Sequence, residues 1–203
     1  MGLFSGAISM ARFQTEPLGE EDIQSFIYSR VQDFSFREDN DNITEMNVGW
    51  VAAHRPFDDT FSPDDIFFSD YVLLGIRVET RKVPAALLKK FYLQQEASLL
   101  QEMNKKALTR RERKLLKERV HQGLLSKTIP VPKMYEMVWH PVQGRLFFLA
   151  TQVKAIEIFE NIFAKTFDVR PVPVVPFNLA LSLFNDSEDI ISKIDGLRPE
   201  VLV

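Results

Sequence analysis

The 203-residue chain is 45% hydrophobic and 26% charged, which is ordinary for a globular protein with one sizeable core or two small ones. It has no cysteine, which excludes disulfides, thiol catalysis and cysteine-ligated zinc and agrees with a reducing cytoplasm. No apolar run approaches the roughly 18 residues that span a bilayer, and Met1 to Arg12 lacks the order of a signal peptide, so we expect no membrane association.

The start of the chain predicts a strand, a helix and a polar loop. Large and small residues alternate from Leu3 to Phe13, which is typical of a strand with one buried face. The three carboxylates at 20–22 then suit the first turn of a helix, whose apolar stripe runs from Ile23 to about Val31. The polar segment 34–42 is expected to form a loop.

Two strands flank an acidic region. Met46 to Ala52 predicts a short strand, and Tyr71 to Thr80 predicts a central one because it is a run of β-branched and aromatic residues. Between Glu16 and Asp70 there are fourteen acidic residues against three basic ones. We interpret this acidity mainly as a solvated surface; the alternative is a set of carboxylates that coordinate a metal.

The segment that begins at Arg81 predicts a long helix. Pro84 suits its first turn, because proline lacks an amide hydrogen that this position leaves unbonded. Five apolar residues share one face over roughly twenty residues, or about 30 Å of helix. They are Leu88, Phe91, Tyr92, Leu99 and Met103.

A second helix is predicted from Arg110 to Leu125. Thr109 and Glu112 have the spacing of a capping box, in which the threonine hydroxyl caps the helix and the glutamate reaches back. The apolar side of this helix consists of Leu116, Val120 and Leu124. A neighbouring face aligns four polar side chains, Arg110, Lys114, Lys117 and His121.

Positive charge is concentrated in this region. Residues 104–127 contain nine basic residues and two acidic ones, a net +7 in a chain of formal charge −3, so the remainder carries about −10. A cationic arm on an acidic body predicts contact with nucleic-acid phosphates, because each Lys or Arg placed against a phosphate releases condensed counterions. The candidate DNA-binding residues are Lys105, Lys106, Arg110, Arg111, Arg113, Lys114, Lys117, Arg119 and Lys127.

The rest of the chain returns to strands around one helix. A β-hairpin with a short glycine-containing turn is expected from Met134 to Thr151. Gln152 to Phe167 predicts an amphipathic helix, and Val169 to Val175 predicts another strand. No structure is assigned to the tail from Phe177 to Val203.

These elements predict an α+β fold, with a mainly antiparallel sheet packed with helices and a projecting two-helix arm. The expected organisation is a central domain of residues 1–80 and 130–183, a helical arm of residues 81–129, and a C-terminal tail of residues 184–203.

Other functions remain open. The sequence contains no zinc-finger spacing and no helix-turn-helix, and the basic helix lacks the interleaved aromatics of a single-strand stacking platform. The basic helix is also compatible with a solvated surface stabilised by pairs such as Glu112 with its neighbouring cations. A further alternative is an interaction module whose arm docks on an acidic partner, such as the 16–70 region of a second copy.

A metal-dependent nuclease is the enzymatic alternative. Its pattern of two carboxylates and a lysine has partial counterparts in Asp64, Glu79 and Lys82, but Arg81 stands where the lysine is expected. Asp64 follows Pro63 and is better explained as part of a turn. The three histidines are scattered without metal-binding spacing. We therefore expect no catalytic residue, no metal site and no cofactor.

Six short motifs follow one another along the chain: Gly49-Trp50-Val51, Arg81-Lys82-Val83-Pro84, Leu115-Leu116-Lys117-Glu118-Arg119-Val120, Leu124-Leu125, Met137-Val138-Trp139 and Pro173-Val174-Val175-Pro176. Their order and approximate spacing, across roughly residues 1 to 183, resemble the bacterial RdgC family of recombination-associated proteins.

The resemblance implies a non-catalytic homodimer that closes into a ring around double-stranded DNA. It implies binding with little sequence preference, limited access of the RecA recombinase to that DNA, and a cytoplasmic, nucleoid-associated location. In that family the ring interior is basic while the whole protein is acidic, which is the division of charge counted in this sequence.

The sequence departs from the family in two respects. Family members are typically longer, with a C-terminal base region that helps form one of two dimer contacts; this sequence ends near where that region would begin, so we expect an arm that grips DNA without encircling it. The family also carries a basic residue and, two positions later, an exposed Phe at the arm tip. The matching positions are Lys127 and Ile129, so a weaker tip contact between copies is expected.

Overall fold

A computed structural model describes residues 8–19, 22–38, 43–58, 60–183, 192–193 and 196 of the chain. Parts of four sequence predictions lie outside these residues: the beginning of the strand expected from Leu3, two of the carboxylates expected at 20–22, the end of the loop expected at 34–42, and most of the tail 184–203.

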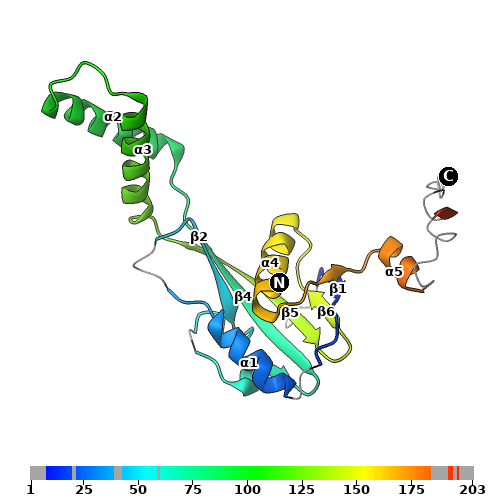
Figure 1. Cartoon of the computed structure of the whole chain (residues 1–203). Helices are drawn as coiled ribbons and strands as arrows, with labels where there is room; N and C mark the ends of the chain where they lie inside the picture. The colour runs from blue at the N-terminus through cyan, green and yellow to red at the C-terminus, as the bar shows by residue number, and fades with distance from the viewer. Residues whose placement is uncertain are drawn as a thin grey trace. The chain divides into compact units, whose positions relative to one another are not determined.

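The described residues form an antiparallel sheet of seven strands with five helices (Figure 1), which confirms the predicted α+β fold. The sheet order is β2-β4-β5-β6-β1-β7, and β3 pairs with β4. The strands are β1 (Ala11–Gln14), β2 (Met46–Val51), β3 (Phe67–Phe68), β4 (Tyr71–Thr80), β5 (Val131–His140), β6 (Arg145–Phe148) and β7 (Val172–Pro173). The helices are α1 (Ile23–Asp33), α2 (Ala85–Glu102), α3 (Arg110–Leu125), α4 (Val153–Phe167) and α5 (Pro176–Leu183), and a short 3-10 helix, η1, spans Pro63–Asp65.

The chain divides into two compact units. Unit 1 consists of Met1–Ser35, Trp50–Ile76 and Tyr135–Val203, and unit 2 consists of Phe36–Gly49 and Arg77–Met134. Both helices of the expected arm, α2 and α3, belong to unit 2.

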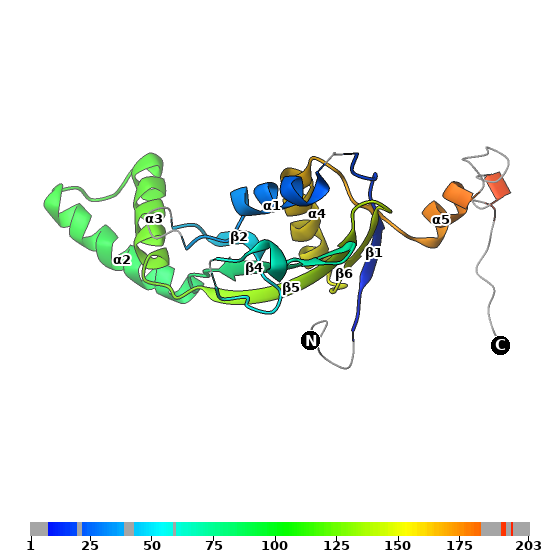
Figure 2. The ribbon, with the colours of Figure 1, turned by 90° about the horizontal axis from the view of Figure 1, so that it is seen from below.

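Unit 1 is built on an aromatic core beneath α4. The buried face of this helix carries Phe159, Phe163 and Phe167, none more than 2% exposed. Phe159 stacks on Phe148 of β6 with ring centroids 4.4 Å apart, and Phe163 meets Trp139 of β5 edge-on at 5.0 Å. Each such side chain stabilises the fold by roughly 1.5–3 kcal/mol through burial. Figure 2 shows α4 and α1 on the same face of the sheet.

Helix α1 begins later than the carboxylates at 20–22 predict. Asp22 is its N-cap, accepting hydrogen bonds from the Ser25 amide at 3.1 Å and the Ser25 hydroxyl at 2.6 Å. These bonds, the hydroxyl first, lower the pKa of the Asp22 carboxyl. Asp22 therefore caps the helix from outside its first turn, and Ile27 and Val31 are its buried residues.

Three expectations about strands and the tail need correction. The described part of the first strand runs only from Ala11 to Gln14. The strand expected from Val169 to Val175 is reduced to Val172–Pro173, because Pro171 and Pro173 have no amide hydrogen for a sheet. Helix α5 was not predicted; it starts at Pro176, where proline fits a first helical turn.

The turn between β5 and β6 packs directly against β1. Gly144 has a φ of +65°, and a Cβ on it would lie 2.1 Å from the Thr15 carbonyl oxygen. The Thr15 amide donates to the Gly144 carbonyl at 2.8 Å, and the Gln14 side chain donates to the Gln143 carbonyl at 2.9 Å. Only glycine fits this position, which sets how β1 lies along β6.

Candidate nucleic-acid interface

Helices α2 and α3 of unit 2 pack through a small apolar cluster. Its buried members are Leu108, Leu116 and Val120, with Leu88, Tyr92, Leu99, Leu100 and Leu124 partly buried against them. The apolar face predicted for α2 is therefore correct at Leu88, Tyr92 and Leu99. It is wrong at Phe91 and Met103, which are exposed because the contact with α3 runs along 88, 92, 99 and 100 instead.

The start of α3 is held by the predicted capping box. The Glu112 amide donates to the Thr109 hydroxyl at 3.3 Å, and the Glu112 carboxylate accepts from the Thr109 amide at 2.8 Å. Lys105 Nζ donates to the same carboxylate at 2.7 Å. The Lys105 hydrogen bond, followed by that of the Thr109 amide, lowers the pKa of Glu112 to about 2. Glu112 thus stays ionised and joins the α2–α3 connection to the helix.

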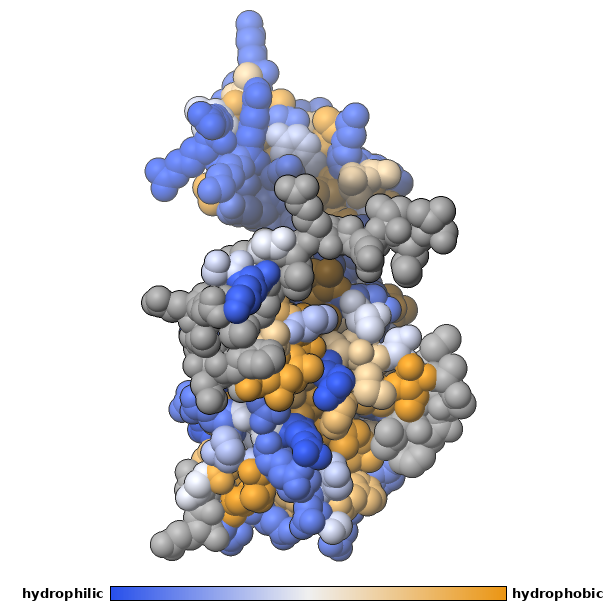
Figure 3. All heavy atoms as spheres, turned by 90° about the vertical axis from the view of Figure 1, so that its right-hand side faces the viewer, coloured by the Kyte–Doolittle hydropathy of each residue, from blue (hydrophilic) through white to orange (hydrophobic). Residues whose placement is uncertain are grey.

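All nine candidate DNA-binding side chains are exposed. Three have an ion-pair partner: Lys105 with Glu112 at 2.7 Å, Arg113 with Glu96 at 3.9 Å, and Lys114 with Glu118 at 3.8 Å. Within the described part of the chain the other six have none; they are Lys106, Arg110, Arg111, Lys117, Arg119 and Lys127. Most of the local positive charge is therefore uncompensated, and in Figure 3 the uppermost part of the molecule, which contains α2 and α3, is largely hydrophilic.

The arginines at the start of α3 oppose the helix dipole, whereas Glu112 in the same turn favours it. Arg110, Arg111 and Arg113 stand in and next to its first turn, and its last turn contains no basic residue. A helix N-terminus carries partial positive charge, so each of these cations opposes helix formation by about 0.3–1 kcal/mol at low ionic strength. For a helix that is only solvated, this placement of cations is a cost without a benefit. For a helix that contacts an anionic partner, the same cations attract that partner.

The ridge predicted on α3 is only partly available to a ligand. Arg110 and Lys117 lack ion pairs among the described residues, whereas Lys114 shares its charge with Glu118. At the end of the ridge His121 Nε2 lies 3.4 Å from a carboxylate oxygen of Glu45. Glu45 is 76 positions away, so no local pattern indicates this contact.

The structure adds one cation to the predicted set. Lys89 of α2 and Lys117 of α3 both line a hollow of about 330 Å³, together with Ala85, Leu88 and Tyr92. Lys89 is exposed and has no ion pair in the described residues. The dipeptide Lys89-Lys90 indicates it in the sequence, but it lies outside residues 104–127, where the positive charge is most concentrated.

The residues proposed for the tip contact follow α3 directly. Lys127 lies just beyond the C-cap residue Ser126, with its amide bonded to the Leu124 carbonyl at 3.1 Å. Ile129 is 81% exposed, the highest value among the large hydrophobic residues that the structure describes. An aliphatic side chain in that position is available to a partner.

The nuclease pattern does not assemble into a metal site in the described residues. Asp64 lies in the 3-10 helix η1 of unit 1, as expected for a turn after Pro63. Glu79 lies in unit 2, where its carboxylate accepts two hydrogen bonds from the 93%-buried Arg77 guanidinium, which also stacks on the Phe36 ring. No three His, Asp or Glu side chains of the described residues lie close enough together to hold a metal ion.

Comparison with protein families identifies a match that covers most of the chain. The family model described as "Putative exonuclease, RdgC" matches residues 11–184, which is most of the chain. A search of curated proteins finds no match. Among the described residues, no helix is both long enough and apolar enough to cross a membrane.

Proposed function

Since this chain belongs to the RdgC family, we propose that it binds double-stranded DNA through the phosphate backbone, without sequence preference and without catalysis. The arginines in and next to the first turn of α3 carry this proposal, because they are exposed and oppose the helix dipole. A phosphate placed beside that turn would be attracted by these exposed cations.

The proposed contact is electrostatic and therefore independent of sequence. The cationic residues are long, exposed side chains, which suit contacts with phosphates better than the reading of base edges. Such contacts position a protein on DNA and lose affinity steeply with salt. The family relationship supports a role in recombination or replication, with limited access of RecA to the bound DNA and a nucleoid-associated location in the cytoplasm.

A gel-shift series with unrelated duplexes at increasing salt tests the proposal. We expect equal affinity for all duplexes and a steep fall with salt. Replacing Arg110, Lys114 and Lys117 together by Gln should reduce the magnitude of the salt slope by about 2–3, since each phosphate contact contributes about 0.9. A matched control is the triple Gln variant of Lys154, Lys165 and Arg170, which are exposed in unit 1. An unchanged slope in the first variant, or an equal loss in both, rejects the arm as the DNA-binding element.

The description of the family model makes exonuclease activity the second function to test. Linear and circular DNA should be incubated with the protein and Mg²⁺ or Mn²⁺. We expect both to stay intact. Shortening of the linear DNA that needs the metal and disappears in Asp64→Ala would establish the nuclease instead.

We also propose that two copies associate through Lys127 and Ile129. The exposure of Ile129 supports this contact. Sedimentation at several concentrations should show a dimer that Ile129→Asp weakens while the circular dichroism spectrum stays unchanged. If the arm docked instead on an acidic protein partner, DNA would not bind even at low salt, and this outcome would replace the DNA proposal.

A further inference from the structure

The sheet of unit 1 has a second face, turned away from α4. Leu146 and Phe148 of β6 are fully buried towards the helix, so Arg145 and Phe147, which alternate with them, point to the opposite side. On this face a hollow of about 250 Å³ is lined entirely by apolar side chains, namely Ile8, Met10, Val138, Phe147 and Leu149. Ile8 and Met10 are 39% and 45% exposed, so the hollow opens to solvent.

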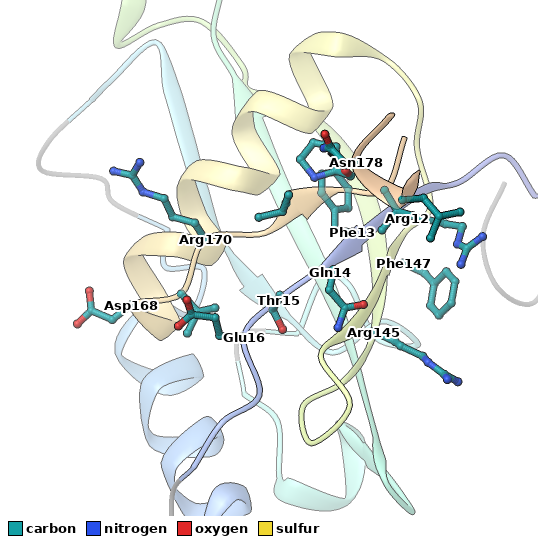
Figure 4. A pocket seen from close by; sticks show the side chains of 15 residues that line it. Arg12, Phe13, Gln14, Thr15, Glu16, Arg145, Phe147, Asp168, Arg170 and Asn178 are labelled. Carbon is teal, nitrogen blue, oxygen red and sulfur yellow. Dashed lines mark hydrogen bonds between the residues drawn. The ribbon is translucent and has the colours of Figure 1, made fainter. Parts of the chain in front are cut away.

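Two arginines lie beside Phe147, next to this hollow. The strand register places Arg12 of β1 directly opposite Phe147 of β6, and Arg145 two residues before Phe147 on the same strand. Both arginines are exposed, and neither has an ion pair in the part of the chain that the structure describes. Figure 4 shows Arg12 of β1 and Phe147 and Arg145 of β6 projecting towards the same side.

In the described part of the chain, the nearby carboxylates form no ion pair with Arg12 or Arg145. A larger hollow of about 820 Å³ shares Phe147 and both arginines and is also lined by Glu16 and Asp168. Figure 4 places these two acids on the other side of β1, and Asp168 pairs with Arg30 at 3.8 Å. On β5, Glu136 is half-buried and lies on the same face as Val138, two residues away, so this surface carries two arginines and one carboxylate.

We propose that this surface binds a protein segment in which a large apolar side chain is flanked by acidic residues. The apolar side chain would enter the hollow beside Phe147, and the carboxylates would pair with Arg12 and Arg145 in bidentate geometry. Burial of the anchor supplies affinity, and the two charge pairs supply orientation and faster encounter. The surface belongs to unit 1 and does not depend on DNA binding by α3.

The lining of the hollow favours a protein segment over a nucleic-acid strand. A base that entered it would bury its polar edge without hydrogen-bond partners, which costs free energy. An aliphatic or phenyl side chain has no such polar edge. Single-stranded DNA is bound by successive aromatic platforms, whereas Phe147 is the one aromatic side chain among the described residues that line this hollow.

Fluorescence anisotropy of the full chain with three labelled probes tests the proposal. The probes are an acidic hexapeptide with a central Phe, the same peptide with Asn and Gln in place of its acids, and an oligothymidylate. We expect saturable, salt-sensitive binding of the acidic peptide and at least about tenfold weaker binding of the neutral one. Failure of the acidic peptide to bind, or equal binding of both peptides, overturns the proposal.

Variants test whether the acidic peptide binds to this surface. The double variant Arg12→Glu, Arg145→Glu should bind the acidic peptide about tenfold or more weakly than the unmodified protein does. The matched double variant Lys154→Glu, Lys165→Glu on α4 should bind it with unchanged affinity. Met10→Asp, at an exposed position ahead of β1, should have the same effect as the arginine variant and keeps the test valid if that variant misfolds. Loss of oligothymidylate binding in these variants, without any peptide binding, would make the surface a nucleic-acid site and reject the proposal.

Discussion

Unit 1 and the α2–α3 pair of unit 2 reach stability by different physical means. Unit 1 buries a stack of aromatic rings between α4 and the sheet, including Trp139, Phe148, Phe159 and Phe163. In contrast, α2 has no fully buried residue, and its contact with α3 rests on three buried aliphatic residues and a capping box. The α2–α3 pair therefore depends much less on buried side chains than unit 1 does.

The largest expected effect is in the core of unit 1. Phe163→Ala removes a fully buried ring that contacts Trp139 and Phe167, and should destabilise the protein by about 3–5 kcal/mol. Urea denaturation followed by near-ultraviolet circular dichroism measures the change. Val153→Ala on the same helix, 70% exposed, is the control and should change stability by less than about 0.5 kcal/mol. Equal effects of both variants would show that the aromatic core is not the main source of stability in unit 1.

A smaller and more local effect is expected in the hairpin. Leu116→Ala leaves a cavity between α2 and α3 and should cost about 2–3 kcal/mol, near the low end for a leucine because the cluster is small and can collapse. Amide hydrogen exchange should accelerate in α2 and α3 while α4 keeps its protection. The neighbouring Leu115, 54% exposed, offers the matched control Leu115→Ala. Uniform acceleration along the chain would mean that the two regions unfold as one.

The cap of α3 comes next in size and depends on pH. Thr109→Ala should cost about 1 kcal/mol of helix stability. Because the pKa of Glu112 is lowered from 4.5 to about 2 in the folded chain, its contribution is present above pH 4.5 and is lost as the pH falls towards 2. In Thr109→Ala the pKa of Glu112 should rise and this acid sensitivity should shrink. A carboxylate titration by NMR measures both, and an unchanged pKa contradicts the capping role.

The smallest effect separates stability from binding. Arg111→Glu replaces a cation that opposes the dipole of α3 by an anion that favours it, so it should stabilise the hairpin by about 0.3–1 kcal/mol. The same change should weaken DNA binding, because it removes an exposed cation without an ion pair in the described residues. Thermal melts measure the change in stability, and gel shifts with the same sample measure the change in DNA affinity. Changes in the same direction would mean that the arginine is structural.

The best sequence predictions rest on strong local signals. Thr109 and Glu112 give the start of α3, and the predicted bounds Arg110 to Leu125 match the structure. On the predicted apolar side Leu116 and Val120 are buried and Leu124 is partly buried, whereas the buried Leu125 was not predicted. The run from Tyr71 to Thr80 is likewise predicted with its exact bounds, because every position favours a strand. In both cases neighbouring residues contain the whole signal.

The failures arise where distant residues decide. The pairing of His121 with Glu45 depends on tertiary contact, and so does the position of Lys89 beside Lys117. Phe91 has the right period for the buried face of α2 but is exposed, because the partner helix fits one side of a broad stripe. The flanking of Phe147 by Arg12 needs the register of β1 on β6, which no local pattern specifies.

The register of β1 on β6 depends on Gly144. Since side chains alternate along a strand, a slip of β1 by one residue would turn Phe13 out to solvent and bring Arg12 into the aromatic core. The contact of Gly144 with Thr15 acts as a positional stop against such a slip. A residue without a side chain therefore decides, from more than a hundred positions away, which side chains of β1 the molecule shows to other molecules.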